Sequence, residues 1–182
     1  MILSAWVRAH AVLPSIAGVV LATLVCAGAS GRATTLAGVQ VRTPWFALLI
    51  CVAFQSLLLN PAFGALESTL VRAGVSRMLQ AVTFAVLSAA PLSVLMSLAD
   101  RRVLVGWYLT LCCVAVLGST FWPDRGWLLS LLAGGGSILL DHLMFRGPVS
   151  VAMNWAPPAA PPVLFLLALG AFSVIPARRE SS

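Results

Sequence analysis

Six apolar stretches dominate this chain, and each is close in length to a helix that crosses a membrane. Such a helix needs roughly 20 mostly apolar residues to pass through about 30 Å of hydrocarbon. The predicted spans are residues 11–30, 44–60, 78–99, 103–122, 127–145 and 159–175. They leave no room for a soluble catalytic domain. We therefore predict an all-α fold: a polytopic membrane helix bundle of six transmembrane helices, forming a single transmembrane domain over residues 1–182.

Composition supports this reading of the spans. The chain is 60% hydrophobic and 9% charged, with a mean hydropathy of +1.02, whereas soluble domains average about half apolar and a quarter charged. The chain has no lysine, and its 11 positively charged side chains are all arginines. Because this composition is typical of GC-rich bacterial genomes, we expect a bacterial plasma membrane protein. The arginines flank the apolar runs instead of forming a stripe, which argues against nucleic acid as a partner. The expected surroundings are the lipid bilayer.

The distribution of arginines predicts the orientation. Six crossings would place both termini on one side of the membrane. That side would hold Arg8, Arg72, Arg77, Arg125, Arg178 and Arg179, and the other would hold Arg32, Arg42, Arg101, Arg102 and Arg146. The α-amino group adds one more positive charge to the terminal side. Because cytoplasmic loops carry the excess of positive charge, we predict that both termini are cytoplasmic.

Polar side chains inside the spans are the first candidates for function, because polar groups in hydrocarbon are costly unless they pair. They are Gln55, Asn60 at the end of the second span, Gln80 at the start of the third, and Asp141 and His142. Gln55 could instead join two helices, a contact worth about 1 kcal/mol. Asp141 and His142 could instead reach the interface or pair with Arg146. Gln55, Asn60, Asp141 and His142 are our candidates for a translocation path.

Backbone features add a further candidate and two packing expectations. Gly134-Gly135-Gly136 interrupts the fifth span, and broken helices in a membrane must face protein or a cavity, so we add Gly135 to the candidate path. Residues 85, 89, 93 and 97 form a small-residue ridge on the third span, typical of close helix packing. The Pro-rich residues 155–162 predict an extended or re-entrant segment before the last span.

Five aromatic residues lie near predicted span ends, where aromatic rings favour the headgroup zone. They are Trp45, Trp107, Tyr108, Trp122 and Trp127.

The chain lacks the patterns of several chemistries. Ser137 and His142 are five residues apart on one helix, about 140° around its axis, so they cannot act as a nucleophile and its base. The sequence has no Cys/His metal spacing and no ATP-binding motif. Its four cysteines lie in apolar runs, where we expect them to remain reduced. We expect no catalytic residue, no metal and no cofactor in the chain itself.

The segment at residues 61–77 is the most informative loop. On a helical wheel Ser68, Arg72 and Ser76 form a polar stripe opposite Leu66 and Leu70. The pattern predicts a short interfacial helix between the second and third spans. Such a helix either anchors the turn to the membrane or receives force from a soluble partner. Glu67 has no cation at i+3 or i+4, which leaves its charge for a contact outside the segment.

With six spans, cytoplasmic termini and this loop, the chain resembles the membrane subunit of type-2 ATP-binding-cassette exporters, in particular small actinobacterial proteins with a Glu-x-x-x-x-Arg stretch here. The resemblance implies a coupling helix that docks on a separate cytoplasmic ATPase, with Glu67, Arg72 and Arg77 as coupling residues. It implies ATP and Mg through that ATPase, a second permease copy or homologue, and export of a drug, lipid or antibiotic peptide. The alternative is a non-transporting immunity or scaffold protein that binds a membrane-active peptide or partner subunits.

The predicted orientation is testable by cysteine labelling in intact cells. In a variant whose only cysteine replaces Ser181, a membrane-impermeant reagent should leave that cysteine unmodified until the cells are opened. Labelling before the cells are opened would reverse the orientation.

Overall fold

The structure is a computed structural model of the chain. It describes residues 12–28, 33–36, 39–59, 73–98, 101–122, 125–143, 151–153 and 156–175. Within these ranges most residues are helical, which confirms the predicted helical character of the fold. The long helices are α2 (Val12–Gly28), α3 (Thr43–Ser56), which continues into the 3-10 turn η1 (Leu57–Leu59), α5 (Ala73–Leu95), α6 (Arg101–Phe121), α7 (Gly126–Leu143) and α9 (Ala160–Val174).

Each long helix falls on one predicted span. Two stretches, Val75–Leu95 and Arg102–Phe121, are long and apolar enough to cross a membrane. The other apolar helices are shorter: Val12–Gly28, Thr43–Leu59, Gly126–Asp141 and Ala160–Val174. The structure therefore bears out the apolar helices, while the number of crossings stays a prediction.

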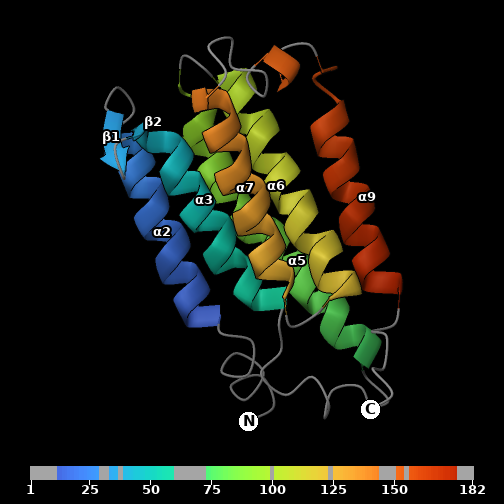
Figure 1. Ribbon diagram of the computed structural model, residues 1–182. Helices are drawn as coiled ribbons and strands as arrows, with labels where there is room; N and C mark the ends of the chain where they lie inside the picture. Colours follow the sequence, from blue (N-terminus) through green and yellow to red (C-terminus); the bar gives the residue numbers. More distant parts are fainter. Residues whose placement is uncertain are drawn as a thin grey trace.

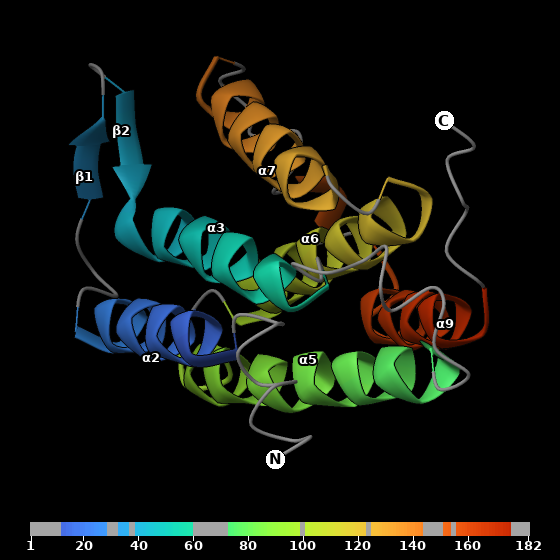
Figure 2. The ribbon, with the colours of Figure 1, turned by 90° about the horizontal axis from the view of Figure 1, so that it is seen from below.

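Consecutive long helices run in opposite directions through the bundle (Figure 1). In the orientation of Figure 1, α2, α5 and α7 run upward, and α3, α6 and α9 run downward. Viewed along the bundle, α6 lies between α3, α7 and α9, with α5 and α2 side by side below (Figure 2). In the apolar stretch of α6 67% of the residues are buried, against 33% in that of α5. Helix α6 is therefore the central element, and α5 is a peripheral one.

A short antiparallel hairpin joins the upper ends of α2 and α3. Its strands are β1 (Ala33–Leu36) and β2 (Val39–Arg42), and Leu36 pairs with Val39. The sequence patterns do not predict a structure for this loop. Two residues, Ala37 and Gly38, separate the strands in sequence, a loop length typical of hairpins.

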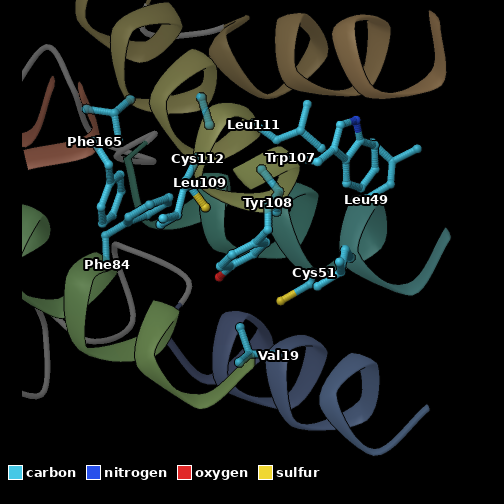
Figure 3. Packing of buried hydrophobic residues seen from close by; sticks show 14 of the residues in the cluster. Val19, Leu49, Cys51, Phe84, Trp107, Tyr108, Leu109, Leu111, Cys112 and Phe165 are labelled. Carbon is cyan, nitrogen blue, oxygen red and sulfur yellow. The ribbon is translucent and has the colours of Figure 1, made fainter. Parts of the chain in front are cut away.

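The hydrophobic core is built around α6. Trp107, Tyr108 and Cys112 are each at most 1% exposed, and they point between the surrounding helices (Figure 3). The interpretation of Trp107 and Tyr108 as headgroup-zone aromatics is therefore wrong. Both residues lie more than a turn inside α6 and on its buried side, so proximity to the end of the helix did not decide their surroundings. Trp122, at 57% exposure, is an outward-facing aromatic as expected.

The fifth span is not broken at its glycines. Helix α7 continues through Gly134, Gly135 and Gly136, because glycine keeps its backbone N–H and costs only about 1 kcal/mol per residue in a helix. Gly134 is the buried member, and a Cβ there would clash with Leu49 and lie 3.2 Å from a methyl carbon of Leu111. At Gly135 and Gly136 a Cβ would meet nothing within 4 Å. The close contact expected at Gly135 is thus made by Gly134.

The Pro-rich segment is also more helical than expected. Helix α9 begins at Ala160 and includes Pro161 and Pro162 in its first turn. Proline is tolerated there because the first N–H groups of a helix have no intrahelical acceptor. The Ala160 N–H donates to the carbonyl of Pro157 over 2.9 Å, so a turn leads directly into the helix.

Helices α2 and α3 pack closely because Gly18 has no side chain. A Cβ at Gly18 would clash with the ring of Phe54. One turn away, the Ser15 hydroxyl donates to the carbonyl of Phe54 over 2.8 Å. The pair of contacts sets the register between the two helices.

The predicted interfacial helix at residues 61–77 lies mostly outside the described residues. The described part, from Ala73 onward, is the first turn of α5 and continues into the long helix. Asn60, Glu67 and Arg72 also lie outside the described residues.

The asymmetry of the glycine triplet can be tested by substitution. Gly134→Leu should destabilise the bundle by about 1 to 3 kcal/mol through overpacking against Leu49 and Leu111, whereas Gly136→Leu should leave its stability unchanged or slightly raised. Thermal unfolding in detergent of the two matched variants measures the difference. Equal destabilisation would contradict the rotation of α7 seen here.

Candidate functional site

A buried pair of polar side chains joins α3 to α6 in the interior of the bundle. The Gln55 amide nitrogen lies 2.8 Å from the Tyr108 hydroxyl oxygen and donates to it, and the hydroxyl lies 3.0 Å from the Gln55 carbonyl oxygen. Both side chains are 0% exposed. Because an unpaired amide or hydroxyl in an apolar interior costs several kcal/mol, each of these two groups depends on the other.

Further polar groups surround this pair. The Cys112 thiol, one turn below Tyr108 on α6, donates to the Gln55 carbonyl oxygen over 3.7 Å. Ser88 of α5 and Cys51 of α3 lie close enough to the Tyr108 hydroxyl to interact with it. We call Gln55, Tyr108, Cys112, Cys51 and Ser88 the interior polar cluster. Figure 3 shows Tyr108, Cys51 and Cys112 within the core.

The local sequence explains how the cluster is brought together. On α3, Cys51 and Gln55 are four residues apart, and on α6 so are Tyr108 and Cys112. Residues at i and i+4 share one face of a helix. The two faces meet because the neighbouring positions Leu48, Val52, Leu111 and Ala115 are buried and apolar.

The chemistry of the cluster is limited to neutral hydrogen bonding. It contains an amide, a phenol, two thiols and an alcohol, and all four cysteines of the chain are free. Among the described residues no group of three His, Cys, Asp or Glu side chains could hold a metal ion. The residues around it include some of the largest fully buried side chains, such as Trp107 and Phe84. The cluster therefore acts as a polar joint in a filled core.

A second inward contact links α6 to α7. The Trp107 indole N–H donates to the Ser137 hydroxyl over 2.8 Å, and that hydroxyl donates to the Gly134 carbonyl at the same distance. The Trp107 ring also lies 4.7 Å from that of Trp45 on α3. Ser137, considered above only as a nucleophile, thus has a packing role here.

Arginines contact the lower end of α9 and the segment that precedes its upper end. At the lower end, the Arg77 guanidinium of α5 donates to the carbonyls of Phe172 and Ile175 and lies 5.1 Å from the centre of the Phe172 ring. These carbonyls end a helix, where acceptors are unpaired and the dipole favours a cation. At the upper end, Arg102 of α6 donates to the Ala156 carbonyl over 3.1 Å.

The structure brings together only part of the predicted set of site residues. Gln55 lies in the core as a helix-joining residue, and Gly135 points away from the contact made by Gly134. Asp141 is half-buried on α7, and Arg77, proposed for ATPase coupling, contacts α9. His142 belongs to α7, but its side chain is not among those described.

Sequence reasoning missed Tyr108 as a member of the cluster. The available signal was that a tyrosine inside an apolar span needs a hydrogen-bond partner, and that Gln55 on another span also needed one. The sequence also gives no sign that Gln80 is 1% exposed or that its amide nitrogen has no hydrogen-bond partner among the described residues.

Comparison with known proteins gave no match of any kind: no family model, no curated protein and no solved structure resembles this chain significantly.

The dependence of Gln55 on Tyr108 can be tested by a double-mutant cycle. Tyr108→Phe keeps the ring but leaves the Gln55 amide unpaired, which should cost about 1 to 3 kcal/mol of stability. Adding Gln55→Leu should recover part of that loss, because both polar groups are then absent. Thermal or denaturant unfolding of the two single variants and the double variant measures the coupling. Additive losses would show that the two groups act independently.

Proposed function

We propose that the chain is a multi-pass protein of a bacterial plasma membrane, with all six long helices crossing and both termini in the cytoplasm. The outer faces of the bundle support this placement. Leu13, Leu21 and Leu24 on α2 and Leu166 and Leu167 on α9 are each more than 60% exposed. Polar side chains such as Gln55, Ser88 and Gln80 are buried instead. An apolar exterior around a partly polar interior suits lipid as the surrounding solvent.

Within that membrane we propose that the chain is the permease subunit of an exporter driven by a separate ATPase. The supporting observation is where the two helices that flank the candidate coupling segment end and begin. Helix α3 with η1 ends at Leu59 and α5 begins at Ala73, both at the lower end of the bundle, where α2 begins and α9 ends (Figure 1). Residues 61–72 join these two points, so cytoplasmic termini would place the segment on the side of a cytoplasmic ATPase.

Because the core is filled, we place the proposed translocation path at an interface between this chain and another. The interior polar cluster is enclosed by large side chains, so a translocated molecule would pass between this chain and a second permease copy or homologue. On α5 the small residues Ala89 and Ser93 are exposed, as is Ser97 just after the helix, which supports α5 as the surface that packs on that second chain. ATP and Mg would bind to the ATPase, and this chain would be the non-catalytic part.

The alternative is a non-transporting immunity or scaffold protein. The filled core favours this alternative. The central polar groups already pair with one another, so the bundle is stable without the conformational changes that transport requires. Its function would then be to bind a membrane-active peptide or partner subunits on the outer faces of its helices.

Charge reversal in the coupling segment tests the permease proposal. In the complex purified with its ATPase, Glu67→Arg combined with Arg72→Glu should uncouple ATP hydrolysis from transport while membrane insertion remains normal. Reversal of the exposed Arg125 at the α6–α7 turn, Arg125→Glu, is the matched control and should retain coupling.

Two results would favour the non-transporting alternative. One is normal coupling in the double variant. The other is the absence of any ATPase that co-purifies with the wild-type chain in detergent.

A further inference from the structure

Gln80 is a buried hydrogen-bond donor whose acceptor is missing. The side chain is 1% exposed, and within the part of the chain that the structure describes its amide nitrogen has no hydrogen-bond partner. Buried polar groups in folded proteins are almost always paired, and an exception calls for an explanation, such as a bound water, ion or ligand. The interior polar cluster does not supply that acceptor, because its own hydrogen bonds are made without Gln80.

The position of Gln80 on α5 indicates where the acceptor comes from. Arg77 and Phe84 of α5 both contact α9, through Phe172 and Phe165 respectively. Gln80 is three residues after Arg77 and four before Phe84, so it shares the face of α5 that meets α9. We call the contacts of Arg77 and Phe84 with α9 the α5–α9 contact. The unpaired amide lies on the same face, between the two ends of that contact.

In the membrane placement proposed above, Gln80 would lie near the ester groups of the cytoplasmic leaflet. The apolar stretch of α5 begins at Val75, and Gln80 lies about 8 Å further along the axis at 1.5 Å per residue. Helical side chains lean toward the N-terminus of their helix, which carries the amide back toward the membrane boundary. Arg77 is one turn closer to the boundary, where its guanidinium could bind a lipid phosphate. The Gln80 amide could donate a hydrogen bond to a glycerol ester carbonyl.

We propose that the α5–α9 contact is a binding site for a diacyl phospholipid of the cytoplasmic leaflet, with Gln80 donating to an ester carbonyl and Arg77 binding the phosphate. This rests on the membrane placement proposed above. A phosphate is a stronger partner for a guanidinium than the neutral carbonyls of Phe172 and Ile175. Lipid binding would therefore compete with the contacts of Arg77 at the end of α9, and a separation of α9 from α5 would admit the ester to Gln80.

The test compares two lipids that differ only in the acceptor. The full chain, purified in detergent, is titrated with diacyl phosphatidylglycerol and with its dialkyl ether analogue, which lacks ester carbonyls. Binding is followed by thermal stabilisation and native mass spectrometry. The wild type should bind the diacyl lipid about fivefold more tightly than the ether lipid, the strength of one hydrogen bond.

Variants separate the two contacts. Gln80→Leu should bind both lipids equally and should be at least as stable as the wild type without lipid, because an unpaired donor is gone; Gln80→Met is a second variant of similar length. Arg77→Gln should weaken the binding of both lipids by the same factor. Ser119→Ala is the matched control, since the Ser119 hydroxyl is another buried group without a partner, and it should keep the diacyl preference.

Three outcomes would overturn the inference: a wild type without diacyl preference, Gln80 variants that keep the preference, or stabilisation by inorganic phosphate equal to that by the lipid. If the chain stays in carbonate-washed membranes, these failures concern the lipid site alone. A chain that washes off would overturn the membrane placement and the lipid site together.

Discussion

The hydrogen bond between Gln55 and Tyr108 fixes how the two most buried helices of the bundle face each other. Both side chains are fully buried, so water cannot replace either hydrogen-bond partner. Rotation of α3 or α6 about its axis would therefore leave the amide or the phenol unpaired. Apolar contacts alone are less selective, since many rotations bury similar area. The pair therefore supplies orientation, and the apolar residues around it supply most of the stability.

The remaining helices take their positions from α6. Trp107 binds Ser137 of α7, the Cys113 thiol lies 3.7 Å from the Leu164 carbonyl of α9, and Arg102 binds the segment before α9. Helix α5 is less enclosed and is joined to α9 by Arg77 and Phe84. Separation of α5 from α9 would leave the Gln55–Tyr108 pair intact. This is why we place the proposed lipid site at the α5–α9 contact.

Arginine has two different roles in this chain. In the sequence, arginines flank apolar spans and predict orientation. In the structure, Arg77 also donates hydrogen bonds to carbonyls at the end of α9, a helix that has no basic residue in its own last turn. A cation next to a helix C-terminus is favourable because of the helix dipole. The same residue can thus contribute to topology, to packing and, in our proposal, to lipid binding.

The sequence by itself determined the six apolar helices and the burial of Gln55, because hydropathy and the cost of an unpaired amide depend on residue type alone. It did not determine which side of each helix faces inward. Neighbouring residues differ by about 100° around a helix, so Gly134 is in contact while Gly135 is open, and Trp107 and Tyr108 are core residues despite lying near a span end. Only the packing of helices from distant parts of the sequence decided these rotations, and it placed Gln55 against Tyr108 and Arg77 against α9.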